Sequence, residues 1–310
     1  MDELRKLADA VLYEGYILWP YRRSALKNQR RWTFGCVFPP GHSAAHPDDR
    51  SEVQAQCLLE GREPRVEATV RFLQVVARRA VDAEGREVDE LEAGGERHSS
   101  WDEAVERELV ACVGQTPIAI AAGSDVELVS GGRIVRGWEP LRGSVELEAE
   151  QLDAGLWRAT VRIANGTVWD RDDREEALRR SFCSAHAIVQ AEGGAFVSPA
   201  DPPGELRDFA CENVGLWPVL VGDEGARDTV FASPIILSDY PRVAPESPGD
   251  LFDGGEIDRL LILNVLSLTR EEQEEMRATD PRAREILERC RALGPGELLP
   301  LHGRLTAEEP

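Results

Sequence analysis

Residues 144–166 read Ser144-Val145-Glu146-Leu147-Glu148-Ala149-Glu150-Gln151-Leu152-Asp153-Ala154-Gly155-Leu156-Trp157-Arg158-Ala159-Thr160-Val161-Arg162-Ile163-Ala164-Asn165-Gly166. Apolar and polar side chains alternate on both sides of the Asp153-Ala154-Gly155 turn, which is the period of a half-buried β-strand. We therefore expect two antiparallel strands whose exposed glutamate and arginine rows pair with each other. Asn165-Gly166 tolerates positive φ angles and suits a further two-residue hairpin turn.

Working outward, the same alternation and the positions of glycine and proline predict more strands. Trp32–Phe38 is an aromatic and β-branched run that Pro39-Pro40-Gly41 closes. Residues 53–60 and 65–78 read as an antiparallel hairpin joined by a turn from Gly61 to Pro64. Shorter candidates follow at 180–191, 195–198, 214–221 and 229–237. This pattern indicates a sandwich or strongly curled sheet.

Helices are expected at both ends of the chain and at one place within it. Apolar residues at helical spacing predict an amphipathic helix over residues 2–13. Ser100 and Glu103 have the spacing of a capping box before a helix from about 101 to 112, and Thr269 and Glu272 repeat that spacing. With Asp280-Pro281 as a second helix start, the C-terminal helices are predicted at 270–278 and 281–292.

The predicted fold class is α+β, mainly antiparallel β, with an N-terminal helix and a C-terminal helical appendage. We expect an N-terminal α+β domain over residues 1–130, an antiparallel β domain over 131–250, and a C-terminal helical segment over 251–310. The last residues, 306–310, are expected to fray.

Composition limits the partners and the compartment. The chain has 310 residues and a formal net charge of -21, so nucleic acid would be repelled over most of its surface. The apolar run from Leu260 to Leu268 is too short to span a bilayer, and the N-terminus lacks a signal pattern. Six scattered cysteines without a Cys-x-x-Cys spacing indicate reduced thiols. We therefore expect a cytoplasmic protein without a membrane span.

The segment from Tyr13 to Trp32 differs from its surroundings, because it concentrates aromatic side chains and basic charge in an acidic protein. Aromatic anchors and arginine forks are typical of protein interfaces and anion sites. The partner-binding residues predicted here are Tyr16, Trp19, Tyr21, Arg22, Arg23, Lys27, Asn28, Arg30, Arg31 and Trp32. The alternatives are a small-anion site, or a segment whose aromatics are core and whose charges pair with the protein's own carboxylates.

Two weaker clusters have metal-ligand side chains. His42 and His46 follow Cys36 and precede Asp48 and Asp49, but their spacing is not that of a recurrent metal site, and a solvated loop explains them better. Cys183 and His186 form the second cluster, although residues three apart in a regular strand point to opposite faces, so a shared ion would need a bulge or a turn. We predict no cofactor. Signature motifs for nucleophilic catalysis or phosphate binding are absent from the sequence.

Two segments carry a family resemblance. One runs from Tyr13-Glu14-Gly15-Tyr16 through Tyr21-Arg22 and Lys27-Asn28 to Trp32-Thr33-Phe34-Gly35, and the other runs from Ser233-Pro234-Ile235-Ile236-Leu237 to Thr279-Asp280-Pro281-Arg282-Ala283. Together they resemble an uncharacterised bacterial family encoded in gene clusters of high-affinity, actinobacterial-type nickel-iron hydrogenases. The resemblance implies an accessory role in assembly, maturation or scaffolding of a hydrogenase or its redox partners.

These observations lead to one functional prediction and one rival. The prediction is a non-catalytic accessory protein that binds another protein through residues 13–32, and the resemblance makes hydrogenase subunits or maturation factors the candidate partners. The rival is a small-molecule or metal-dependent enzyme of unknown reaction that uses His42 and His46 or Cys183 and His186.

Overall fold

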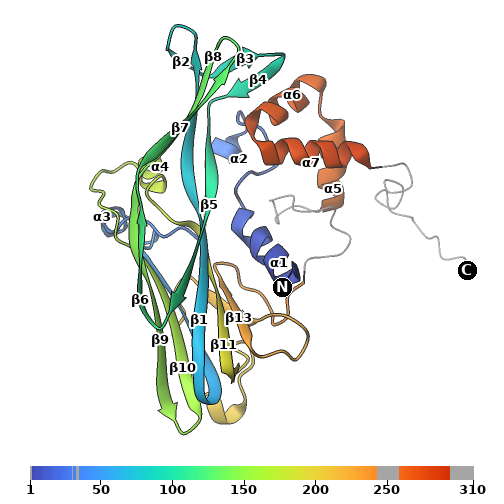
Figure 1. Cartoon of the computed structure of the whole chain (residues 1–310). Coiled ribbons are helices and arrows are strands. Elements are labelled where there is room, and N and C mark those ends of the chain that lie inside the picture. Colours follow the sequence, from blue (N-terminus) through green and yellow to red (C-terminus); the bar gives the residue numbers. More distant parts are fainter. Residues whose placement is uncertain (1, 30, 33–34, 243–257, 294–310) are drawn as a thin grey trace, which may run out of the picture.

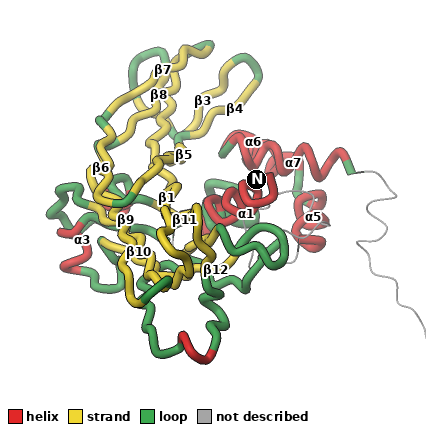
Figure 2. The backbone as a smooth tube through the Cα atoms, turned by 60° about the horizontal axis from the view of Figure 1, so that its bottom comes forward, coloured by secondary structure: helices red, strands yellow, loops and turns green. Residues whose placement is uncertain are grey.

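A computed structural model describes residues 2–29, 31–32, 35–242 and 258–293. One large, strongly twisted antiparallel sheet forms the body of the molecule, and most of the helices lie on one side of it (Figures 1 and 2). The fold is α+β and mainly antiparallel β, with a helix at its N-terminus and three helices near its C-terminus, which confirms the predicted class.

The helices are α1 (Asp2–Tyr13), α2 (Leu26–Gln29), α3 (Pro40–Ala45), α4 (Arg174–Leu178), α5 (Asp258–Ser267), α6 (Arg270–Thr279) and α7 (Pro281–Ala292), with a 3-10 turn at Gly204–Leu206. The strands are β1 (Glu52–Asp82), β2 (Glu87–Val88), β3 (Glu90–Ala93), β4 (Glu96–Ser99), β5 (Trp101–Cys112), β6 (Gly114–Ile120), β7 (Gly123–Val129), β8 (Gly132–Trp138), β9 (Leu141–Asp153), β10 (Leu156–Asn165), β11 (Cys183–Phe196), β12 (Trp217–Leu220) and β13 (Thr229–Ser233).

β1 is the central strand, and its two halves have different neighbours in the sheet. Its first half pairs with β10, its second half pairs with β5, and β11 pairs along both halves. The register with β11 shifts between Gly61 and Arg65. Odd-numbered residues of β1 face the main core up to Leu59, and even-numbered residues face it from Val66 onward. The two halves therefore contribute to the same hydrophobic core, as two walls of a curled sheet.

This arrangement corrects the predicted hairpin of 53–60 and 65–78. The two segments belong to one strand, and they pair with β10, β11 and β5 rather than with each other. The Gly61–Pro64 stretch acts as a β-bulge, which bends a strand without reversing it. A Cβ on Gly61 would lie 2.8 Å from the carbonyl oxygen of Gly193, so the close approach of β11 requires glycine there.

The predicted helix over 101–112 is also wrong, because this segment is strand β5. All twelve of its residues are in register with β1, from Arg78 opposite Trp101 to Glu67 opposite Cys112. Ser100 does not cap a helix; its hydroxyl donates to Val88 O (2.7 Å) and accepts from Ala80 N (2.9 Å). Long-range pairing has overridden a local helix signal.

The hairpin of β9 and β10 is confirmed, with its turn at Asp153–Leu156. Arg158 lies opposite Glu150 and Arg162 opposite Glu146, and both arginines form the ion pairs expected from the sequence, Arg158 at 2.7 Å. The second hairpin turn predicted at Asn165-Gly166 is wrong. Asn165 is instead buried, and its side-chain amide donates to Val37 O and Arg180 O, both at 2.8 Å.

The other strand predictions have mixed outcomes. β12 and β13 lie within the segments predicted at 214–221 and 229–237, whereas the segments 180–191 and 195–198 correspond to the single strand β11. Within Trp32–Phe38 the described residues form only one isolated bridge, Val37 with Phe182, and residues 33–34 lie outside the described part of the chain.

Both C-terminal helix starts are confirmed. The Thr269 hydroxyl accepts from Glu272 N, and the Glu272 carboxylate accepts from Thr269 N, so a full capping box begins α6. Asp280 accepts from Arg282 N (2.9 Å) at the start of α7, with Pro281 in the first turn. α1 also has the predicted bounds. Among the described helices, none is long and apolar enough to cross a bilayer.

The predicted domain boundary at 130/131 falls in the turn between β7 and β8, whose strands pair from Gly123–Trp138 to Val129–Gly132. Strands on both sides of that position belong to the same sheet. The boundary predicted at 250/251 lies outside the described residues.

Candidate functional site

The aromatic side chains of the 13–32 segment are largely buried. Tyr16 is 2% exposed, Tyr21 is fully buried, and Trp32 is 7% exposed, whereas Trp19 is half-buried with its ring 5.9 Å from that of Tyr21. Tyr16 and Trp32 belong to a core cluster that includes residues of α5, α6 and α7. These aromatic side chains therefore belong to the core, which is one of the alternatives that the sequence left open.

The segment holds the C-terminal helices against the sheet. The Tyr16 hydroxyl donates to Asp280 Oδ2 at 2.6 Å, and the amide of Arg23 donates to the Thr279 hydroxyl at 3.2 Å. Thr279 and Asp280 form the junction between α6 and α7. We call the Tyr13–Trp32 segment the clamp, because it connects this junction to the rest of the fold.

Arg31 is the buried cation of the clamp. Its guanidinium donates to Tyr16 O at 3.1 Å and to the carbonyl oxygen of Asp102, and it lies over the Trp101 ring at 3.6 Å and the Trp32 ring at 4.3 Å. Burial lowers the pKa of this guanidinium from its ordinary value, and nearby acidic groups oppose that effect. Cation–π contacts are strongest where water is excluded, so Arg31 stabilises the fold and is not available to a partner.

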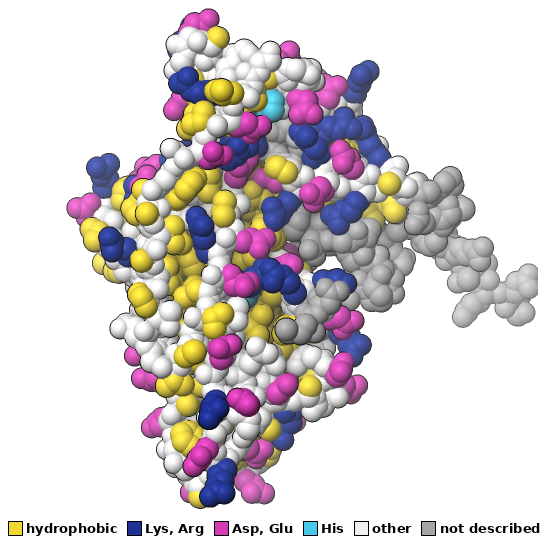
Figure 3. Space-filling model, viewed as in Figure 1, with side chains coloured by type: hydrophobic (Ala, Val, Ile, Leu, Met, Phe, Trp, Pro, Cys, Tyr) yellow, Lys and Arg dark blue, Asp and Glu magenta, His cyan; other side chains and the backbone are white. Residues whose placement is uncertain are grey.

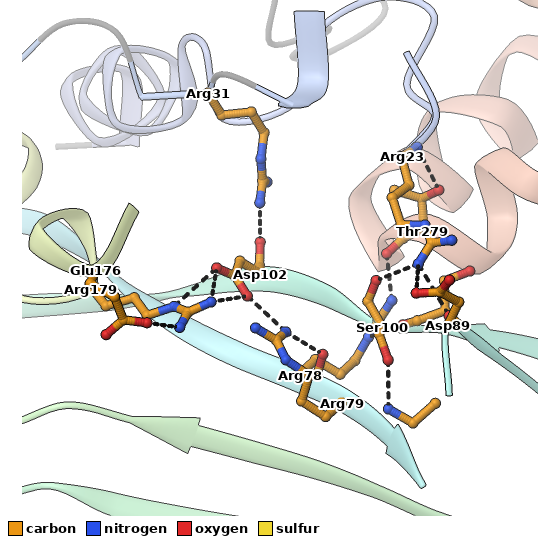
Figure 4. Close-up of polar contacts among 12 residues, drawn as sticks. Arg23, Arg31, Arg78, Arg79, Asp89, Ser100, Asp102, Glu176, Arg179 and Thr279 are labelled. Atoms are coloured by element: carbon orange, nitrogen blue, oxygen red, sulfur yellow. Dashed lines mark hydrogen bonds and ion pairs between the residues drawn. The ribbon is translucent and has the colours of Figure 1, made fainter. Parts of the chain in front are cut away.

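Two charge networks continue from this point (Figure 4). The Asp102 carboxylate accepts from Arg79 at 2.8 Å and from Arg179 at 3.0 Å. Arg78, which is 7% exposed, donates to Ala278 O and Thr279 O at the end of α6. The strand β1 is thus bonded directly to the last turn of α6.

The remaining predicted partner-binding residues differ in their burial and in their contacts. Arg22 forms ion pairs with Glu272 (3.1 Å) and Glu275 (3.6 Å), and Arg23 forms one with Asp89 (3.5 Å). Asn28 is buried and bonds the backbone of the clamp, while the side chain of Lys27 is exposed. Arg30 lies outside the described residues. The acidic surface that Arg22 and Arg23 contact belongs to this chain.

The two histidines of the first metal candidate, His42 and His46, form separate ion pairs. His42 is buried and its Nε2 lies 2.9 Å from Asp49 Oδ2, and His46 Nε2 lies 2.9 Å from Asp172 Oδ1. The two imidazole rings stack with centroids 4.4 Å apart. Each histidine therefore has a carboxylate partner of its own, in the arrangement of a packed loop.

The second metal candidate does have the bulge it would need. Ser184 has a φ of 52°, and the register shift beside it places both Cys183 and His186 on the face of Arg71 and Leu73. Cys183, however, interacts with the thiol of Cys36, and His186 bonds through Nδ1 to Ser184 O at 3.1 Å. Burial lowers the pKa of His186 to about 4, so the ring is neutral. Across the described ranges, no three His, Cys, Asp or Glu side chains are grouped as a metal site would require.

A cleft of about 480 Å³ lies between the β3–β4 hairpin and the helices α6 and α7. Its charged lining residues are of both signs: Arg97, Arg277, Arg284, Glu92, Glu96, Glu274 and Glu288. Arg284 and Glu96 already approach each other across it at 3.8 Å. A cleft whose charges compensate one another has little preference for a charged ligand.

The surface that the sequence reasoning missed is the open side of the curled sheet, between β5 and β6. Five of the eight large hydrophobic side chains that are exposed among the described residues lie between residues 105 and 128: Val105, Val110, Val113, Val126 and Leu128. Leu109 and Ile120 are half-buried there, and both pack against the main core. We call Val105, Leu109, Val113 and Ile120 the open-side patch; Val110 follows Leu109 in β5, so its side chain lies on the opposite face of the sheet. In Figure 3 hydrophobic side chains gather on the middle part of the sheet, whereas charged side chains gather over the helices.

A sequence signal for this surface exists. From Val110 to Ser124 the chain has no charged residue, although 30% of all residues are charged. β6 and the end of β5 lie within this run. An uncharged segment would ordinarily be read as core, but here much of it is exposed to solvent.

The comparisons with known proteins add no assignment: no protein-family model matches the chain, and the search of curated proteins gives no significant match.

Proposed function

We propose that this protein is a non-catalytic accessory protein that binds another protein through the open-side patch. The observation that carries the proposal is the group of exposed apolar side chains in and beside the uncharged run from Val110 to Ser124, in a chain of net charge -21. Isolated apolar side chains at a surface need no explanation, but clustered ones are typical of interaction sites. We therefore place the binding site on β5 and β6. The described aromatics and arginines of the 13–32 segment make their contacts within the chain.

The sequence resemblance supplies the first partners to test, which are subunits or maturation factors of a nickel-iron hydrogenase. In this proposal the accessory protein acts in assembly, maturation or scaffolding. The acidic surface around the patch would steer encounter with a basic region of the partner, while the apolar contact would supply most of the affinity.

The test is a pull-down of the tagged protein from its native host, followed by reconstitution with the purified partner. Val113 is 60% exposed in the turn between β5 and β6, and Val168 is 87% exposed elsewhere. Val113→Asp should reduce capture and the measured affinity at least about tenfold, because it places a charge in an apolar contact. Val168→Asp is the matched control and should bind as the parent protein does.

Equal capture by the Val113→Asp and Val168→Asp variants would contradict the placement of the site. Failure of the parent protein to retain any chain after cross-linking in the cell would contradict protein binding itself. The variant Arg22→Glu/Arg23→Glu tests the site that the sequence predicted in residues 13–32. Loss of binding by this variant with an unchanged fold would place the binding site on the clamp.

A further inference from the structure

The two strands that border the open side differ in their free edges. β5 pairs only with β1 and β6 pairs only with β9 among the described strands, so each has one unpaired edge. Pro117 lies in the middle of β6 and has no N–H to donate. Proline is a common device against edge-to-edge pairing. β5 contains no proline from Trp101 to Cys112, so its edge lacks that protection.

The backbone groups that β5 offers can be identified. The carbonyl of Asp102 accepts from Arg31, which is on the side away from β1. Backbone groups of an antiparallel strand alternate between its two edges with a period of two residues. The N–H and C=O groups of Glu108 and Val110 therefore point to the free edge as well, and both residues are exposed.

The side chains beside this edge have opposite character on the two faces of the sheet. On the core side lie Leu109 and Ala111, which pack against the hydrophobic interior. On the other face lie Glu106 and Glu108, whose side chains are 39% and 46% exposed although both also form ion pairs with Arg71. A strand added here would place every second side chain against apolar residues and the alternate ones beside carboxylates.

We propose that β5 binds an extended segment of another protein by strand addition, and that this segment alternates apolar and basic residues. This inference rests on the proposed function and specifies its mode. The added strand would cover Leu109 and Ile120 at the open side, and its basic side chains would lie beside Glu106 and Glu108. Main-chain hydrogen bonds give affinity in such complexes, and the alternating side chains give specificity.

The occupant is another protein rather than a second copy of this chain. Two copies would each bring a net charge of -21 to the contact, and repulsion between like-charged bodies opposes that association. A basic and apolar strand instead lowers the electrostatic energy while it covers the same edge.

The experiment uses the full chain and a synthetic probe: a capped peptide of nine residues that alternates valine and lysine, with a fluorescent label. Val110→Pro removes an outward N–H and leaves the hydrogen bonds between β5 and β1 in place. Val110→Thr keeps that N–H and is the matched control. We expect the parent and the Val110→Thr protein to bind the peptide, and the Val110→Pro protein to bind it at least about tenfold more weakly.

Thermal unfolding and circular dichroism establish that the Val110→Pro protein is folded. If it is not, two further peptides give the same test from the ligand side, one with its central valine and one with an adjacent lysine replaced by proline, because N–H groups alternate between the two edges of a strand and one of these replacements removes an N–H that faces β5. Equal affinity of both Val110 variants, or of the unsubstituted peptide and both proline-containing peptides, would overturn strand addition. Tight binding of a valine–glutamate peptide would overturn the assigned charge. A parent dimer that Val110→Pro dissociates would make the occupant a second copy and overturn the inference.

The failure of this inference can be told apart from failure of the proposed function. If the parent does not bind the peptide but a host protein is still lost on Val113→Asp, the patch binds its partner in another mode. If neither the peptide nor a host protein binds, the proposed function fails as well.

Discussion

The hydroxyl of Tyr16 donates to Oδ2 of Asp280 at 2.6 Å, which joins two buried residues that are 264 positions apart. The same carboxylate accepts from the backbone of Arg282 through Oδ1, and so begins α7. Asp280 thus both caps a helix and fixes that helix to the clamp. The helical layer is oriented by specific polar contacts as well as by its apolar cluster.

Tyr16→Phe should lower the free energy of unfolding by about 1.5–3 kcal/mol, because a buried carboxylate loses one donor. The measurement is urea denaturation followed by tryptophan fluorescence. Tyr13→Phe is the matched control, since the Tyr13 hydroxyl donates at 2.6 Å to Glu106, whose carboxylate is 39% exposed. Water can replace that donor, so a smaller loss is expected. A Tyr16→Phe protein as stable as the parent would show that the bond contributes nothing.

Local signals account for the parts of the fold that the sequence predicted well. The capping box of Thr269 and Glu272 and the start at Asp280-Pro281 are complete within four residues. The alternation that predicted β9 and β10 is equally local, because their turn joins adjacent strands. In each case the residues that determine the element are its sequence neighbours.

Where the prediction failed, the deciding partners are distant. Trp101 has helical spacing to Ala104 and Val105, but it is the pairing of β5 with β1 that makes the segment a strand. The burial of Tyr16 depends in the same way on Asp280. An aromatic and basic segment has the same composition whether it faces solvent or its own C-terminal helices. Composition alone therefore could not show whether this segment is exposed to solvent or buried against the C-terminal helices.

Acidification should destabilise the protein through His186. Burial lowers the pKa of its imidazole to about 4 in the folded state, from an ordinary value near 6.5. Between those values the unfolded chain binds a proton that the folded chain does not, so stability falls as pH decreases from 6.5 to 4. The full effect is on the order of 3 kcal/mol.

The measurement for His186 is the free energy of unfolding at several pH values, with an NMR titration of the imidazole. His186→Asn should flatten this part of the pH dependence. The control, His98→Asn, replaces a half-buried histidine of β4 and should leave the dependence in place. An NMR titration of His186 near pH 6.5 in the folded protein would contradict the prediction.

Native thiol reactivity should single out Cys112. It is the exposed cysteine, whereas Cys36, Cys57, Cys183 and Cys290 are buried. Burial raises the pKa of the Cys57 thiol, and contact with Cys36 together with burial raises that of Cys183, so neither supplies the reactive thiolate at neutral pH. Brief alkylation followed by mass spectrometry should label Cys112 first and the half-buried Cys211 more slowly. Rapid labelling of Cys183 would show that the clamp opens readily.

Arg78→Met should destabilise the protein most, by about 3–5 kcal/mol, because it breaks a buried charge-paired contact. Besides the α6 carbonyls, the Arg78 guanidinium donates to Ser99 O at 3.0 Å and to the Glu103 carboxylate at 2.6 Å. Methionine fills a similar volume but leaves these acceptors without their donor. The control is Arg65→Met, whose side chain is 85% exposed and 3.9 Å from Glu192, and which should lose less than about 1 kcal/mol.

Hydrogen exchange separates a local effect from a global one. If Arg78 holds α6 on β1, the Arg78→Met protein should lose protection first in α6 and α7, while β9 and β10 keep theirs, because the guanidinium bonds to Ala278 and Thr279 of α6. A uniform loss of protection would mean that the sheet itself depends on Arg78. Unchanged protection in α6 would contradict the view that Arg78 docks the helical layer, since its bonds to Ala278 and Thr279 are the contacts that join β1 to the end of that helix.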